Sequence, residues 1–173
     1  LRDSTVRDVR RRAKYLLLDV PAGSALVHLG MSGSLRVLER GAETRAHDHL
    51  DLLLDDGKLL RFNDPRRFGS WQWQPAGTLH PQLAALGPEP FDAVFDGTYL
   101  KRRSAGRRVN VKHFLMDQHI VAGVGNIYAA EALFRAGIDP RRAAGRVSLA
   151  KYQSLAGHAR EILRHAIERG GTT

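Results

Sequence analysis

The chain has 173 residues, of which 27 are lysine or arginine and 18 are aspartate or glutamate, so its formal net charge is +9 at pH 7. A hydrophobic content of 43% excludes a disordered chain, and the lack of cysteine excludes a disulfide scaffold, a cysteine zinc site and a thiol nucleophile within these residues. No run approaches the roughly 18 apolar residues of a membrane span, and the polar start does not resemble a signal peptide, so we expect a soluble intracellular protein.

The first half of the sequence predicts antiparallel β-structure, because short apolar runs rich in Leu and Val alternate with turn signals. Asp55-Asp56-Gly57 lies between two leucine runs and is the clearest hairpin turn, since Asp and Gly tolerate the positive φ that such turns require. The predicted strands cover residues 11–20, 25–31, 34–38, 49–54, 58–62 and 68–73.

The composition changes at Leu86, because the Gly87-Pro88-Glu89-Pro90 segment continues neither a strand nor a helix. We therefore place a β-sandwich over residues 1–86, a linker over 87–98 and a helical domain over 99–173. The expected fold class is α+β.

Three helices are predicted in the second half. The clearest begins at the N-cap Ser148 and ends at Gly170-Gly171, with apolar residues spaced by three and four between them. Shorter helices are predicted over residues 111–116 and 127–135, and a tight glycine turn over 121–125 joins them.

Arginine dominates the basic residues, with 22 arginines against five lysines. A guanidinium presents a planar fork to two phosphate oxygens, and a basic chain gains from counterion release on nucleic acid. For any one cluster, solvated surface charge is the better explanation, but recurrence in both halves predicts nucleic-acid binding. The clusters are Arg10-Arg11-Arg12, Arg66-Arg67, Lys101-Arg102-Arg103, Arg107-Arg108 and Arg141-Arg142.

The glycine turn has the geometry of an anion cradle. Gly123 and Gly125 allow a close approach of the backbone, and Asn126 opens a helix whose free N–H groups and positive dipole end suit a phosphate. The alternative is an ordinary glycine turn in which Asn126 is only the N-cap.

Five segments of the chain resemble segments of the formamidopyrimidine-DNA glycosylase family and occur in the same order as in that family. Residues 118–140, QHIVAGVGNIYAAEALFRAGIDP, resemble its helix–two-turn–helix motif. The other four segments are RRAKY at 11–15, HLGMSGSL at 28–35, DPRRFG at 64–69 and LGPEP at 86–90. These versions are more similar to the formamidopyrimidine and 8-oxoguanine branch than to the endonuclease VIII branch.

The resemblance implies a bifunctional bacterial repair enzyme, monomeric, cytoplasmic and associated with the nucleoid. It implies that the enzyme flips an oxidised purine out of duplex DNA, cuts the glycosidic bond and eliminates both phosphates at the abasic site. The family uses an N-terminal proline amine, an adjacent glutamate and a zinc ion in a C-terminal finger of four cysteines. We expect these parts to lie outside the 173 residues, and a protein of these residues alone to be inactive and to hold no cofactor.

The resemblance also assigns roles within the chain. Lys14 corresponds to a lysine of the elimination chemistry, although a simple phosphate contact explains it equally well. Met31, Arg66 and Phe68 correspond to residues that fill the gap left by the flipped nucleotide, and we call these three residues the wedge. The positions that the family uses for DNA contact are His47, Arg66, Arg107, Gly125 and Asn126.

The run His47-Asp48-His49 offers the only hint of a metal site, because alternate residues of a strand point the same way. No third ligand is evident, so we expect no metal there.

Two other functions remain open from the sequence. One is an endonuclease VIII-like glycosylase for oxidised pyrimidines, and the other is a DNA-binding core without catalysis. In every case we expect duplex DNA to bind between the two halves, with an affinity that falls steeply as salt rises.

Overall fold

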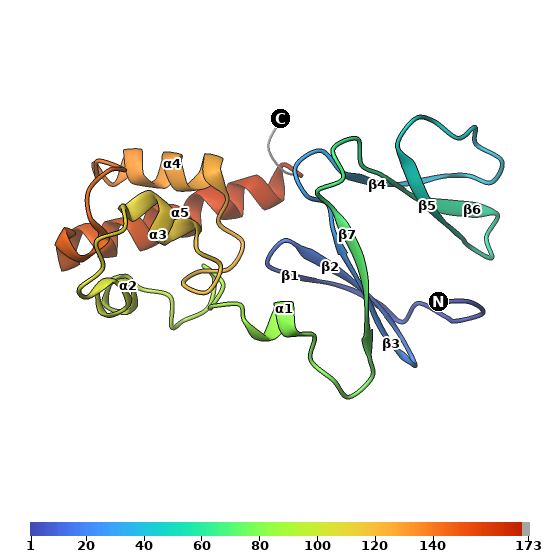
Figure 1. Cartoon of the computed structure of the whole chain (residues 1–173), viewed down its shortest axis with the longest axis horizontal. Coiled ribbons are helices and arrows are strands. Elements are labelled where there is room, and N and C mark those ends of the chain that lie inside the picture. The colour runs from blue at the N-terminus through green and yellow to red at the C-terminus, as the bar shows by residue number, and fades with distance from the viewer. Residues whose placement is uncertain (171–173) are drawn as a thin grey trace. The chain divides into compact units, whose positions relative to one another are not determined.

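A computed structural model describes residues 1–170 of the chain. Its contacts divide it into two compact units, Leu1–His80, unit 1, and Pro81–Thr173, unit 2. Strands make up unit 1 and helices make up unit 2 (Figure 1). The α+β class is therefore confirmed. Every helix in the described range is too short or too polar to cross a membrane.

Unit 1 contains two antiparallel sheets. The four-stranded sheet has the order β1-β2-β3-β7, and the three-stranded sheet has the order β4-β6-β5. Phe62 and Trp71 connect the two sheets, with their ring centroids 6.2 Å apart. The strands are β1 (Asp8–Arg12), β2 (Tyr15–Val20), β3 (Gly23–His28), β4 (Ser34–Glu39), β5 (Asp48–Leu53), β6 (Lys58–Asn63) and β7 (Ser70–Pro75).

The predicted strand over residues 11–20 is wrong, because the chain reverses within it. Arg12 pairs with Tyr15 across a two-residue turn, in which Ala13 has a φ of +54°. The turn lacks Gly and Pro, so the sequence carried no punctuation there. The strand predicted over residues 25–31 ends at His28, because Gly30 takes a φ of +64°.

Unit 2 contains five α-helices and one 3₁₀ helix in its described part. Helix α3 has the predicted bounds, and α5 begins after the predicted N-cap Ser148, whose hydroxyl accepts a hydrogen bond from Lys151 N at 3.3 Å. The helices are α1 (Pro81–Ala84), α2 (Gly97–Ser104), α3 (Val111–Met116), α4 (Asn126–Arg135), η1 (Ala144–Arg146) and α5 (Leu149–Glu168).

One apolar cluster forms the core of unit 2. Leu100, Leu115 and Leu155 are completely buried in it, and Phe114 packs against Tyr152 with 6.2 Å between ring centroids. These side chains come from α2, α3 and α5, and Leu133 of α4 lies in the same cluster, so the core joins the two helices on either side of the glycine turn.

The segment predicted as a linker packs closely against the rest of unit 2. Gly87 N donates to the Gln118 carbonyl at 2.8 Å, and Ala122 N donates to the Pro88 carbonyl at 2.9 Å. A Cβ at Gly87 would lie 2.8 Å from two carbonyl oxygens, so only glycine fits there. The structure divides after His80, six residues before the boundary expected at Leu86, and the segment predicted as a linker belongs to the helical unit.

Candidate nucleic-acid interface

Three loops of unit 1 leave the four-stranded sheet at the same end. Tyr15 begins β2, and it pairs with His28 at the end of β3, which pairs with Ser70 at the start of β7. The β1–β2 turn, the 29–33 loop and the 64–69 loop therefore emerge side by side. These loops carry Lys14, Met31, Arg66 and Phe68, four residues to which the sequence assigned roles.

The 29–33 and 64–69 loops interlock through glycine. A Cβ at Gly30 would lie 2.6 Å from the carbonyl carbon of Phe68, and a Cβ at Gly69 would lie 2.7 Å from the carbonyl oxygen of His28. Such distances leave no room for any side chain. The glycines of the two motifs are therefore required by the contact between the loops.

The buried side chain of Asp64 joins the two loops. Its carboxylate accepts hydrogen bonds from Gly69 N at 2.6 Å and from the Ser32 hydroxyl at 3.3 Å, and only 1% of the residue is exposed. The backbone N–H of Gly69 is the main reason why the pKa of Asp64 is lowered. Asp64 is therefore an ionised side chain shared by both loops, and the sequence analysis had assigned it no role.

The wedge side chains stand out from this rigid base. Met31 is 73% exposed and Phe68 is 56% exposed, although large apolar side chains usually lie inside. The guanidinium carbon of Arg66 lies 4.8 Å from the centroid of the Phe68 ring. The structure thus excludes core packing for these residues and groups them as an exposed tip with two apolar side chains and one charge.

His47 lies in the backbone network of the same region. Its carbonyl accepts a hydrogen bond from Asp64 N at 3.0 Å, and its φ is +72°. His47 precedes β5, and a register shift follows between Asp48 and Leu50, so the expectation that His47 and His49 point the same way on one strand is wrong. His49 Nε2 instead contacts the Asp64 carbonyl at 2.9 Å.

Arg61 anchors the loop that leads to His47. Its guanidinium donates to Asp51 and to the carbonyls of Ala42 and Glu43 and forms an ion pair with Asp48, and only 5% of the residue is exposed. The loop is consequently held by a buried charge network, which the spacing of residues in the sequence did not reveal.

Lys14 has a neighbour that the sequence analysis missed. His28 pairs with Tyr15 on the neighbouring strand, and their ring centroids lie 5.0 Å apart. The sequence had assigned no role to His28. Burial lowers the pKa of His28, and the positive charge of Lys14 lowers it further. Desolvation also lowers the pKa of the Lys14 amine. Lys14 and His28 thus lie at the same end of the sheet as the wedge loops, and the position of His28 at the start of the HLGMSGSL segment was the available signal.

Unit 2 presents the glycine turn at the start of α4. Gly125, not Asn126, is the N-cap, and no side chain caps the helix. The first-turn N–H groups have no acceptor inside the helix, so they face outward together with the exposed Asn126 side chain. The Gln118 side chain accepts from Gly123 N at 2.8 Å and donates to the Val124 carbonyl at 3.1 Å, which holds the turn in shape.

Arg107 is exposed on the same unit, and its guanidinium carbon lies 5.8 Å from the centroid of the Phe114 ring. Stacking on an aromatic ring restrains a guanidinium and leaves its edge available for hydrogen bonds. Both units thus carry ordered donors and cations that suit phosphate oxygens.

Comparison with known proteins agrees with this geometry. Residues 1–71 match the profile described as "Formamidopyrimidine-DNA glycosylase N-terminal domain", and residues 86–173 match that described as "Formamidopyrimidine-DNA glycosylase H2TH domain". The chain belongs to the formamidopyrimidine-DNA glycosylase family. The resemblance seen in the five sequence segments is confirmed.

Named relatives and solved structures place the chain within this family. Formamidopyrimidine-DNA glycosylase of Stenotrophomonas maltophilia (strain K279a) is 66% identical over 97% of this chain, and that of Photobacterium damsela subsp. piscicida is 56% identical over 100% of this chain. The Lactococcus lactis enzyme bound to DNA containing an abasic site superposes with a TM-score of 0.92 at 30% identity, over 98% of the chain and 66% of that protein. The chain spans 62% and 64% of the two relatives' lengths.

The cysteine ligands of the zinc ion that the resemblance implies are not among these residues. The sequence has no cysteine, and in residues 1–170 no three His, Asp or Glu side chains come together where a metal could be held.

Proposed function

We propose that this chain is the lesion-recognising part of a bifunctional DNA glycosylase and abasic-site lyase that removes oxidised purines, 8-oxoguanine and formamidopyrimidines, from duplex DNA. The observation that carries the proposal is the exposed wedge on two loops that Asp64 joins. A solvated thioether and phenyl ring on a rigid base have little reason to be exposed unless they enter an apolar environment. The base stack of DNA is such an environment.

The residues of the chain divide the work of recognition. Met31 and Phe68 replace the stacking that is lost when a nucleotide is flipped, and Arg66 faces the base left without a partner. Asn126, Arg107 and His47 contact phosphates and fix the position of the duplex without reading its sequence.

Lys14 acts next to the wedge. A charged amine there neutralises a phosphate and is placed to donate a proton during elimination.

Relatives support the substrate class. Solved structures that match the chain include the Lactococcus lactis protein with DNA containing Fapy-dG, and MutM with DNA containing carbocyclic 8-oxo-G. Each covers 98% of the chain at 30% identity.

The test measures excision by the full-length protein that contains this chain. The substrates are matched duplexes that contain 8-oxoguanine, an oxidised pyrimidine or no lesion. We expect preferential release of 8-oxoguanine, and a borohydride-trapped adduct with the abasic strand. Preferential release of the pyrimidine would place the protein with the endonuclease VIII-like enzymes, and binding without release would show a DNA-binding core alone.

A further inference from the structure

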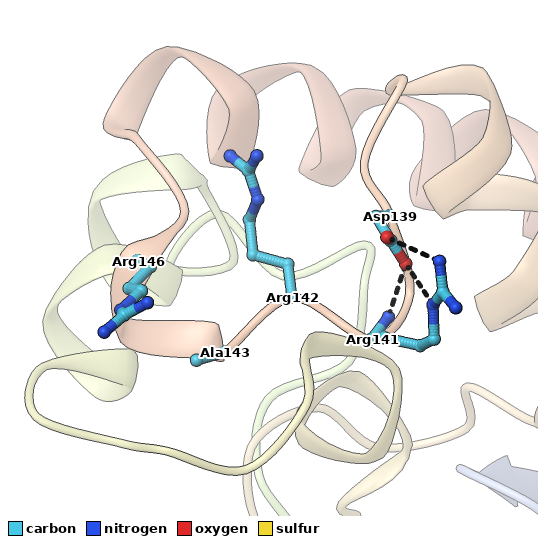
Figure 2. A pocket seen from close by; sticks show the side chains of 5 residues that line it. All are labelled: Asp139, Arg141, Arg142, Ala143 and Arg146. Atoms are coloured by element: carbon cyan, nitrogen blue, oxygen red, sulfur yellow. Dashed lines mark hydrogen bonds and ion pairs between the residues drawn. The ribbon is translucent and has the colours of Figure 1, made fainter.

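Unit 2 has a second basic site, located beyond the C-terminal end of α4. A hollow of about 540 Å³ is lined there by Asp139, Arg141, Arg142, Ala143 and Arg146 (Figure 2). Helix α4 has ten residues, so its two ends lie about 15 Å apart. The hollow is therefore separate from the N–H groups at the start of α4.

The charges in the hollow are unbalanced. Arg141 pairs with Asp139 at 3.2 Å, and its backbone N–H also donates to that carboxylate at 2.9 Å. Figure 2 shows Arg142 and Arg146 extending away from this pair. Within residues 1–170 neither of them forms an ion pair with a carboxylate, and both are exposed. Two guanidinium groups thus remain for an external anion.

The backbone beneath the hollow is held by hydrogen bonds. Val111 N donates to the Arg142 carbonyl and Ala144 N donates to the Val109 carbonyl, both at 2.8 Å, so the two segments pair as antiparallel chains. The Tyr152 hydroxyl donates to the Ala144 carbonyl, also at 2.8 Å. A rigid backbone reduces the entropy that is lost when the arginines bind a ligand.

The lining favours a phosphate over a peptide. Ala143 is the one apolar side chain that lines the hollow, so no pocket exists for the aromatic or aliphatic anchor that protein partners usually supply. Arginine forks match the two free oxygens of a phosphodiester. Gly145 N donates to the Arg107 carbonyl at 3.0 Å, which places the hollow beside a residue already assigned to phosphate contact.

We propose that Arg142 and Arg146 bind the phosphate backbone of nucleic acid at a second contact, distinct from the Gly125 turn. The contact adds affinity without reading sequence and takes no part in the chemistry at the lesion. The identity of the polyanion rests on the proposed function, whereas the position of the contact rests on the hollow itself.

The test compares the intact protein with the Arg142→Ala/Arg146→Ala double variant. Dissociation constants for a long lesion duplex are measured between 50 and 200 mM salt, with excision under saturating substrate and a thermal melt beside them. Loss of two phosphate contacts should make the log–log salt slope shallower by about 1.8. Excision under saturation and the melting temperature should stay unchanged, because both side chains are exposed and outside the lesion site.

Two matched variants serve as controls. Arg164→Ala/Arg169→Ala removes the same charge from exposed positions near the other end of α5, and it should leave the slope close to that of the unmodified protein. Arg142→Lys/Arg146→Lys keeps the charge without the fork, so the slope should be retained while affinity falls.

Equal slopes for the unmodified protein and the alanine double variant would overturn the inference. Binding to polyglutamate is measured in parallel. If the alanine double variant lost binding to polyglutamate but bound DNA as the unmodified protein does, the inference would also be overturned, and an acidic protein partner would be indicated. Failure of the unmodified protein to prefer the lesion duplex would instead defeat the proposed function, whatever the slopes.

Discussion

Unit 2 buries a continuous apolar cluster, whereas unit 1 places charged side chains beneath its functional loops. Leu100, Leu115 and Leu155 have no exposed surface, and they come from three different helices. In unit 1, Arg61 and Asp64 are buried, at 5% and 1% exposure, and each forms hydrogen bonds to the backbone of a loop. Unit 2 therefore obtains its shape from apolar packing, whereas the loops of unit 1 depend on a few polar contacts.

The largest effect should come from the core of unit 2. Leu155→Ala removes a fully buried side chain and leaves a cavity, which should lower the free energy of unfolding by about 2–5 kcal/mol. Chemical denaturation measures the loss. Ile127→Ala, at a side chain that is 59% exposed on α4, should change stability by less than about 0.5 kcal/mol. Equal losses for the two variants would contradict a packed core.

The wedge should respond in the opposite way, through function instead of stability. Phe68→Ala removes an exposed ring, so the melting temperature should hardly change, while loss of stacking of roughly 1–3 kcal/mol should reduce lesion capture by about 5- to 150-fold. Excision beside a thermal melt measures both. Phe62→Ala, at a ring that is 6% exposed, is the matched control and should lower the melting temperature. A large loss of stability in Phe68→Ala with normal excision would refute the wedge.

Asp64→Asn tests whether the two loops act as one unit. The amide keeps the shape but replaces one carboxylate oxygen with a donor that faces Gly69 N or the Ser32 hydroxyl. Lesion capture should fall, by less than in Phe68→Ala, and the effects of the two substitutions should not add. A double-mutant cycle of excision rates measures the coupling, with Asp56→Asn in an exposed turn as the control. Full additivity would show that Asp64 does not position the wedge.

The ionisation of Asp64 should also make the stability of the protein depend on pH. Its pKa in the folded protein is lowered from 3.8, so its contribution to stability is complete above that value and is lost as the pH falls through the lower folded pKa. Acid unfolding of Asp64→Asn should therefore depend less steeply on pH below about 4. An unchanged acid profile would count against an ionised Asp64.

Removal of a phosphate contact in unit 2 should have a smaller effect on DNA binding. The effect should differ between the charged Arg107 and the neutral Asn126. Arg107→Ala should weaken binding to all sequences and make the salt slope shallower by about 0.9, because one counterion-releasing contact is lost. Asn126→Ala should weaken binding by about 2- to 13-fold, from a net hydrogen bond of about 0.5–1.5 kcal/mol, without changing the slope. Sequence-dependent losses would contradict both assignments.

Lys14→Arg should have the smallest effect on DNA binding, limited to alkaline pH. Desolvation lowers the pKa of Lys14, so its amine loses its charge at a lower pH than an ordinary lysine, and its attraction for phosphate decreases from that point. Arginine stays charged, so the variant should bind DNA with a flatter alkaline profile. Identical profiles of dissociation constant against pH would show that Lys14 does not contact phosphate.

The sequence by itself determined the fold class, the family and the strongest helices. Ser148, with its hydroxyl acceptor, and the glycines after α5 are local signals that act within one turn, so the bounds of the helix were predictable. The grouping of Met31 with Arg66 and Phe68 came from the family resemblance alone. Nothing in the spacing of these residues brings them together.

Only the tertiary structure decided how the site is held. Ser32 and Asp64 are 32 residues apart, yet one hydrogen bond joins the wedge loops through them. The reversal at Ala13 and the pairing of Tyr15 with His28 likewise depend on strand register, which places His28 beside Lys14. Contacts of this kind arise when distant segments pack and a buried charge must find partners, and a local pattern of residues does not encode them.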